Sequence, residues 1–387
     1  MREARARTRT EAVATLHVVL PGAAMIAVTF GLARYGYGLL LPDMQAGLGL
    51  DPRAAGLIAS GAYLAYLAGN IAVVWLTARF GPRLPIAMAA SLAALGMAAI
   101  AAADGPLGLA VGVLVAGSAA GLAFPPYADV VAQRVPARRR AVSWSAISSG
   151  TGWGVAIAGP LAIVLGGHWR PVWLVFAGIA AVVGVVAVRA APAHCPRTEH
   201  PLPRLRWSWF VCPRSRPLLV SAVLVGAGSS VWWAFSVDAM RVAGVAETPA
   251  RITFAGCGVA GILASATGMV TDRIGLRRCY LALCVVLTAA VALLGVAGSH
   301  LGTALISATL FGVAYNGVVA AQGLWSAEVF HERPSGGLAA VNTALTLGTV
   351  TGPALAGAVI HSYGYPAALI GAAALVALAS AQAPPAR

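Results

Sequence analysis

The sequence of 387 residues is poor in charge and contains no lysine. Only 10% of its residues are charged, and all 26 basic residues are arginine. Without lysine there is no GKS/T phosphate-binding loop and no lysine nucleophile. The seven histidines form no HExxH motif and the five cysteines form no CxxC pair. We therefore expect a protein that is not an enzyme, that uses no cofactor or metal, and that keeps its thiols free.

Apolar residues are abundant instead, at 59% of the chain, which is more than a soluble domain of this size carries. Runs of about 20 apolar residues, enough to cross a ~30 Å hydrocarbon core, recur along the sequence. The runs lie near residues 16–41, 54–76, 84–103, 106–132, 141–166, 171–189, 217–240, 250–271, 279–298, 301–327, 336–361 and 365–382. The first run is longer than a signal-peptide core, so we interpret it as an uncleaved transmembrane helix. The sequence predicts an all-α integral membrane protein with 12 transmembrane helices.

One segment between the runs differs in composition from the rest. Residues 191–216 hold several prolines and arginines, which break helices and require water. This segment is predicted to be a cytoplasmic linker between an N-terminal six-helix half, 1–190, and a C-terminal six-helix half, 217–387.

The arginines indicate the orientation. Alternate intervals between the runs, including both termini and the linker, hold 21 arginines, and the other intervals hold only Arg53, Arg170, Arg241 and Arg251. By the positive-inside rule both termini are cytoplasmic, at a bilayer face that carries anionic lipid. Because the arginines lie between apolar runs and not in one patch, the net charge of +14 does not indicate nucleic acid as a partner. We expect a monomer.

The two predicted halves repeat one another. Arg79-Phe-Gly81-Pro-Arg83 is a copy of Arg273-Ile-Gly275-Leu-Arg277, Gly159-Pro160 is a copy of Gly352-Pro353, and Asp43 corresponds to Asp238. The three separations, from 79 to 273, from 159 to 352 and from 43 to 238, are 194, 193 and 195 residues. Two copies of a six-helix unit are typical of secondary transporters, in which the substrate path lies between the halves.

Two motifs carry a resemblance to a known superfamily. The first matches the G-x-x-x-D-R-x-G-x-R-R signature of the major facilitator superfamily, at Gly268, Asp272, Arg273, Gly275, Arg277 and Arg278. The second, Gly348-x-x-x-Gly352-Pro353, is similar to the glycine-proline signature of antiporters in that superfamily. The opening stretch 31–42 resembles a prokaryotic branch, the YbfB-like transporters.

The resemblance implies alternating-access transport of a small organic solute across the prokaryotic cytoplasmic (inner) membrane. Proton-coupled antiport, hence efflux, is favoured. Proton-coupled uptake and a non-transporting membrane sensor remain as alternatives, and the substrate is open.

The cytoplasmic hinge has a physical interpretation as a gate. The carboxylate of Asp272 is attracted to a helix N-terminus in the other half, near residues 141–143, and Gly275 supplies the turn. Arg277 and Arg278 either belong to the gate or anchor the loop in the cytoplasm. The first half has Ala78 at the position of the aspartate, so its latch is in doubt.

Two acids near the cytoplasmic ends are expected to form other ion pairs. We expect Asp129 to pair with Arg79 or Arg83, and Glu328 to pair with Arg273. The alternative is that Asp129 carries the coupling proton.

Arg34 is the leading candidate for binding the solute. It lies about 18 residues into its helix, roughly 27 Å of rise, where an isolated charge is costly. Flanked by Tyr35 and Tyr37, it suits a carboxylate, a phosphate or an aromatic ring. The alternative is an internal salt bridge, for instance to Asp43 or Asp238, or a side chain that reaches outward. Other deep polar or aromatic candidates are Asn70, Trp232, Tyr315, Asn316 and Asn342.

Asp272→Asn is expected to favour opening of the carrier toward the cytoplasm, because a neutral amide is attracted less strongly to a helix N-terminus. Accessibility labelling from each side of the membrane measures this shift, and labelling identical to that of the parent protein would contradict the latch.

Overall fold

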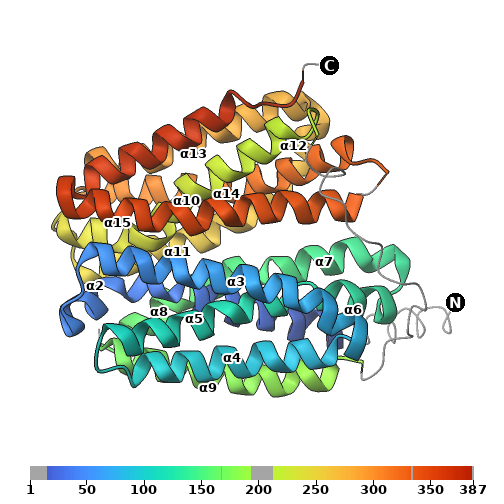
Figure 1. Cartoon of the computed structure of the whole chain (residues 1–387), viewed down its shortest axis with the longest axis horizontal. Coiled ribbons are helices and arrows are strands. Elements are labelled where there is room, and N and C mark those ends of the chain that lie inside the picture. The colour runs from blue at the N-terminus through green and yellow to red at the C-terminus, as the bar shows by residue number, and fades with distance from the viewer. Residues whose placement is uncertain (1–14, 167, 193–211, 333, 386–387) are drawn as a thin grey trace, which may run out of the picture. The chain divides into compact units, whose positions relative to one another are not determined.

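The computed structural model describes residues 15–166, 168–192, 212–332 and 334–385 (Figure 1). The N-terminal arm, most of the predicted linker, Arg333 and Arg387 lie outside these residues. Within them the chain is helical and has no β-strand. The predicted all-α fold is confirmed.

The first predicted run is a helix with an irregular middle. Residues 15–26 are α-helical, and the π-helix η1 (Ala27–Arg34) and helix α2 (Gly36–Leu48) follow. The remaining helices of the N-terminal part are α3 (Pro52–Phe80), α4 (Arg83–Ala101), α5 (Pro106–Ala123), α6 (Pro126–Arg134), η2 (Ala137–Arg139), α7 (Arg140–Ser148), α8 (Gly150–Val164) and α9 (Trp169–Ala190). Those of the C-terminal part are α10 (Arg216–Val242), α11 (Glu247–Ile262), η4 (Leu263–Ala266), α12 (Thr267–Ile274), α13 (Leu276–Ala297), α14 (Leu301–Val329) and α15 (Pro334–Ser380).

In the described part of the chain, eleven helical stretches are long and apolar enough to cross a membrane. The last stretch, Gly336–Ser380, contains two of the predicted runs. Gly364 separates them, because its backbone (φ 82°, ψ 174°) is not helical and lies in the region that favours glycine. With this stretch counted as two, the described part of the chain has twelve long helical stretches, the number of transmembrane helices that the sequence predicts.

The chain forms two compact units that do not coincide with the two sequence halves. Unit 1 comprises 1–36, 65–158 and 168–201, and unit 2 comprises 37–64, 159–167 and 202–387. One end of α3, one end of α8 and nearly all of α2 therefore group with the C-terminal half. The division at the linker into two six-helix halves stays a prediction.

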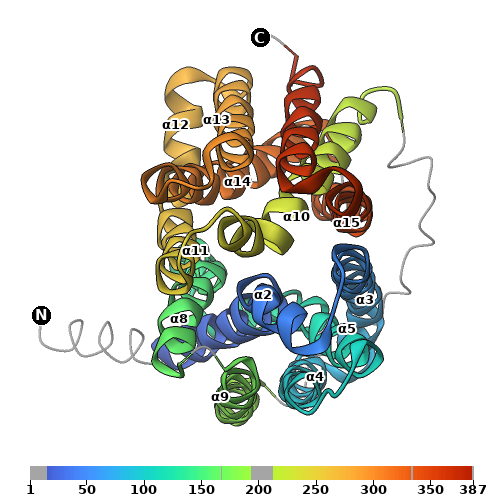
Figure 2. The ribbon, with the colours of Figure 1, turned by 90° about the vertical axis from the view of Figure 1, so that its left-hand side faces the viewer.

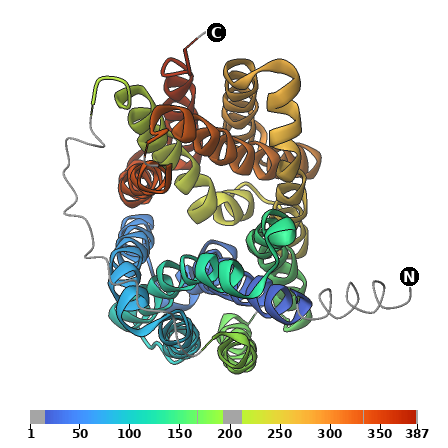
Figure 3. The same cartoon turned by 90° about the vertical axis from the view of Figure 1, so that its right-hand side faces the viewer.

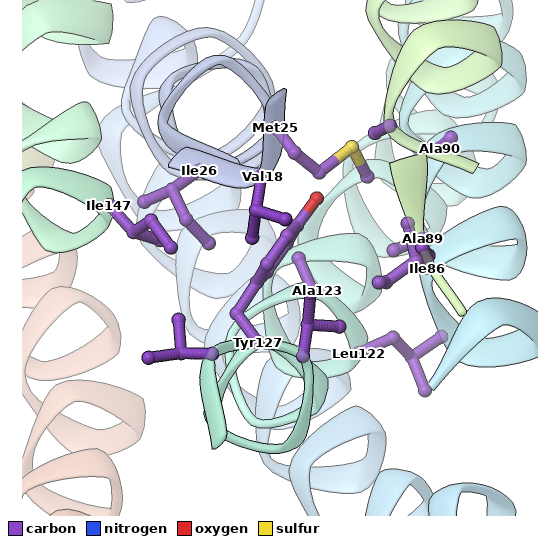
Figure 4. Close-up of a cluster of buried hydrophobic side chains, with 14 of the residues drawn as sticks. Val18, Met25, Ile26, Ile86, Ala89, Ala90, Leu122, Ala123, Tyr127 and Ile147 are labelled. Atoms are coloured by element: carbon purple, nitrogen blue, oxygen red, sulfur yellow. The ribbon is translucent and has the colours of Figure 1, made fainter. Parts of the chain in front are cut away.

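Unit 1 is organised around α4, which packs against both α5 and α9 (Figure 2). Its buried cluster brings together residues far apart in the sequence, including Val18, Met25, Ile86 and Leu122 around the ring of Tyr127 (Figure 4). Tyr127 is only 2% exposed. The mostly aliphatic packing explains why the sequence of this region reads as continuous apolar runs.

Unit 2 is organised around α10, which packs along α15, while α13 packs on α14 and α15 (Figures 2 and 3). Glycines set the closeness of α10 and α15. A Cβ atom on Gly226 would lie 2.1 Å from the carbonyl oxygen of Leu345, and one on Gly348 would lie 2.0 Å from that of Val223. Small residues allow such backbone contact between membrane helices, where packing is the main attraction.

Gly226→Ala is expected to lower the free energy of unfolding by about 1–3 kcal/mol, because the new methyl group overpacks the contact between α10 and α15. Gly256→Ala is the matched control, since a Cβ atom at this helical position meets nothing within 4 Å. Thermal unfolding of both variants in the same detergent measures the difference. Equal melting temperatures would contradict the packing role.

Candidate functional site

Arg34 ends the π-helix of unit 1 and lies among aromatic rings. The amide of Tyr35 donates to the carbonyl of Phe30 at 2.9 Å, a wide turn of the π type. The guanidinium carbon of Arg34 lies 4.0 Å from the ring centre of Tyr66 and 5.5 Å from those of Phe30 and Tyr35. A cation over aromatic faces is attracted by their quadrupoles. Single π-type turns are frequent at functional sites.

Close helix packing places this π-helix. A Cβ atom on Gly31 would lie 2.4 Å from backbone atoms of Gly154, and a Cβ atom on Gly154 would lie 2.2 Å from the carbonyl oxygen of Ala27. The two backbones are therefore in direct contact. Because Gly31 lies within one turn of Arg34, the contact constrains the backbone from which the Arg34 side chain extends.

The other binding candidates divide between the units. Asn70 belongs with Arg34 and Tyr35 to unit 1; it is half-buried, and in the described part of the chain its buried amide nitrogen has no hydrogen-bond partner. Tyr37 belongs to unit 2, and its hydroxyl donates to the carbonyl of Ala55 at 2.9 Å.

The remaining candidates also lie in unit 2. Trp232 is 1% exposed and stacks on Phe311 at 4.0 Å, which in turn stacks on Tyr315 at 5.6 Å. Asn316 donates to the carbonyl of Gly312 at 2.9 Å, and Asn342 is exposed. Trp232 has the surroundings of a packed core residue, whereas Asn316 is half-buried and bonds within its own helix. A cavity shared by all eight candidates stays a prediction.

The cytoplasmic hinge and its copy have the same backbone conformation at their glycines. Gly275 (φ 85°) separates α12 from α13, and Gly81 (φ 76°) lies between α3 and α4. Both values lie in the region that favours glycine. A Cβ atom on Gly268 meets nothing within 4 Å.

The charged hinge residues are solvent-facing. Asp272, Arg273, Arg278 and Arg83 are exposed. Arg277 donates to the carbonyl of Pro384 at 2.6 Å, which ties the turn to the end of the described chain. The latch between Asp272 and the other half stays a prediction.

The expected pairing of Asp129 with Arg79 or Arg83 stays a prediction. Among the described residues, no ion pair joins Asp129 to Arg79 or Arg83. The guanidinium of Arg79 instead lies 5.9 Å from the ring centre of Trp75. On the other side of the repeat, the backbone carbonyl of Glu328 accepts a hydrogen bond from Arg214 at 3.4 Å, and the pair of Glu328 with Arg273 stays a prediction.

A buried ion pair in unit 2 was not foreseen. Arg251 in α11 is 2% exposed and donates to Asp43 of α2 at 2.7 Å. It also contacts Glu247 at 2.6 Å and donates to the carbonyl of Ala162, at the end of α8, at 3.0 Å. Asp43, which the sequence suggests as a partner of Arg34, is thus paired with Arg251 instead. The available signal was that Arg251 is one of only four arginines on the less basic side.

Each glycine-proline motif lies at a close contact between helices of unit 2. The first motif lies beside Arg251, and the second lies beside α3. A Cβ atom on Gly159, which precedes Pro160, would lie 2.7 Å from the carbonyl oxygen of Arg251. A Cβ atom on Gly56 would lie 2.3 Å from the carbonyl oxygen of Pro353.

A hydrogen bond also joins these two helices, α3 and α15, one residue after Pro353. The amide of Ala354 donates to the hydroxyl of Ser60 in α3 at 2.9 Å. A Cβ atom on Gly352 would lie 2.3 Å from the carbonyl oxygen of Ala227. Gly56 and Gly159 therefore allow helices of the two sequence halves to touch, whereas Gly352 lies against α10 of its own half.

Solved structures share this fold. A mutant of the nucleoside transporter NupG has a TM-score of 0.80 at 12% identity, over 94% of this chain and 98% of that chain. A bacterial homolog of the human lysosomal transporter Spinster, inward-facing and unoccupied, has a TM-score of 0.76 at 15% identity, over 95% and 96% of the two chains. These two matches show that the chain shares its fold with solved membrane transporters.

The particular family follows from the sequence. The family described as uncharacterised MFS-type transporter YbfB matches residues 26–382. The chain belongs to this family, and is therefore a secondary transporter of the major facilitator superfamily. No match was found among the curated proteins.

Asp43→Asn is expected to lower the free energy of unfolding by about 1–3 kcal/mol, because Arg251 loses a charged partner in a buried position and keeps only Glu247. Asp104→Asn is the control: Asp104 is fully exposed and lies 4.0 Å from Arg170, so its removal should leave stability unchanged. Thermal unfolding of the two variants compares them. A loss as small as the control's would show that the pair is not structural.

Proposed function

We propose that this transporter exchanges a small organic solute for protons in the cytoplasmic membrane, with both termini in the cytoplasm and as a monomer. Efflux is the favoured direction. The solute carries a carboxylate, a phosphate or an aromatic ring, and Arg34 binds it.

The observation that supports this proposal is the place of Arg34 among Phe30, Tyr35 and Tyr66. A guanidinium in an apolar helix is costly unless the surroundings or a ligand stabilise it, and such residues mark substrate pathways in membrane proteins. Arginine binds planar anions through two parallel N–H donors and stacks on flat rings. A planar solute is therefore the best match to this site.

Exchange of solute for protons is supported by the glycine-proline motifs and by the buried acids of unit 2. Gly159-Pro160 and Gly352-Pro353 lie where helices of the two sequence halves touch. A rearrangement of these contacts would change the side of the membrane from which the solute can enter. Buried carboxylates in membrane proteins often carry protons. Anionic lipid at the arginine-rich face completes the expected environment.

The neighbour described as a nucleoside transporter suggests one class of probe. Nucleosides offer a flat base to a guanidinium, and nucleotides add a phosphate. We therefore include both in a binding screen beside carboxylic acids, with neutral sugars and cationic drugs as classes that the Arg34 site should not favour.

The test is a thermal-shift screen of the purified full chain followed by reconstitution. A planar or anionic solute should raise the melting temperature of the parent protein and should have little effect on Arg34→Ala, because the binding cation is gone. Arg189→Ala is the control, since Arg189 is exposed at the end of α9. Stabilisation that Arg34→Ala retains would remove Arg34 from the binding site.

Direction of coupling is read from proteoliposomes that contain a pH-sensitive dye and an acidic lumen. Antiport predicts that adding the solute outside makes the lumen more alkaline, because protons leave as the solute enters. In a second experiment the outside is the more acidic side. If adding the solute then acidifies the lumen, the coupling is uptake together with protons instead. Binding without any flux would identify a sensor on a transporter scaffold.

A further inference from the structure

Asp238 in α10 is a buried carboxyl group without a basic partner in the described part of the chain. It is 4% exposed. The hydroxyl of Tyr365 in α15 forms a hydrogen bond with Oδ2. The amide of Gln45 in α2 faces the same group, and with its nitrogen turned inward it donates to Oδ1 at 3.0 Å and to Oδ2 at 2.7 Å.

The titratable groups around Asp238 come from α2 and α15. Asp43 and Tyr37 of α2 and Tyr365 of α15 interact with it electrostatically or by hydrogen bonding. Asp43 is engaged by Arg251 at 2.7 Å. The two acids, which correspond in the internal repeat, therefore have opposite environments.

The partners of Asp238 suit either protonation state. A tyrosine hydroxyl can donate or accept, and a glutamine amide presents two donors or, after a half-turn of its end group, an acceptor. With the carboxylate ionised, Gln45 and Tyr365 donate to it. With the carboxyl group protonated, its O–H can donate to the oxygen of Gln45 or Tyr365. No hydrogen bond is lost in either case, whereas Asp43 accepts its hydrogen bond from a guanidinium, which can only donate.

We propose that Asp238 binds the coupling proton of this transporter, which rests on the proposed exchange of solute for protons. The proton comes from water and adds to a carboxylate oxygen of Asp238, and release reverses the step. Ionisation places a second negative charge near Asp43, which disfavours the arrangement of α2 against α10 and α11. Loss and gain of the proton would thereby change the stability of the contacts around Arg251.

The test uses the proton itself as the probe. Infrared difference spectroscopy of the purified full chain, titrated through acid and neutral pH, follows the C=O stretch that only protonated carboxyl groups show. We expect a band in the parent protein that is absent in Asp238→Asn and present in the exposed-acid control Asp104→Asn. Circular dichroism and gel filtration establish that the variants are folded.

Asp238→Glu decides the matter if the Asn variant does not fold. The band should be retained but displaced, because the carboxyl group stands on a longer side chain. A band that keeps its position and size in both Asp238 variants would overturn the proposal. Because this readout needs no solute, it fails or succeeds independently of the transport assay in proteoliposomes.

Discussion

The structure depends on one constraint: inside a bilayer, each backbone polar group and each charge must find its partner within the protein. In the described part of the chain, the regular backbone hydrogen bonds are those of helices. Three ionisable side chains are stabilised by their neighbours, each in a different way. Arg34 lies over aromatic rings, Arg251 is surrounded by acids and a carbonyl, and the carboxyl group of Asp238 is surrounded by groups that can donate or accept.

These three arrangements have different consequences for transport. The stacking of Arg34 leaves a planar cation in the membrane part of unit 1, which suits recognition of a planar solute. The pair of Arg251 with Asp43 joins segments of both sequence halves within unit 2. The site of Asp238 adjoins that pair through α2, which would link proton binding to the same contacts. In our proposals, recognition and coupling therefore rest on different charged residues, Arg34 and Asp238.

The sequence predicted the spans because hydrophobic length is a local property. The sequence also predicts two separate runs, 336–361 and 365–382, where the structure has helix interrupted only at Gly364. Contacts were harder to predict. Asp43 and Arg251 are about 200 residues apart, and only the fold brings them together. Asp129 and Arg79 lie near the same membrane face, yet position in depth does not specify which side chains meet. The π-turn before Arg34 was also missed, because apolar periodicity does not distinguish it from an α-helix.

Our proposals meet in one claim: gain and loss of a proton at Asp238 change the contacts around Arg251 in unit 2. Distance measurement by electron paramagnetic resonance tests this claim directly. The spin labels are placed at Arg53 and Ala243, which are both exposed at helix ends. The labelled protein lacks the native cysteines. The account predicts two distance populations in lipid, with proportions that change with pH and with the transported solute. A single population that neither pH nor solute alters would contradict it.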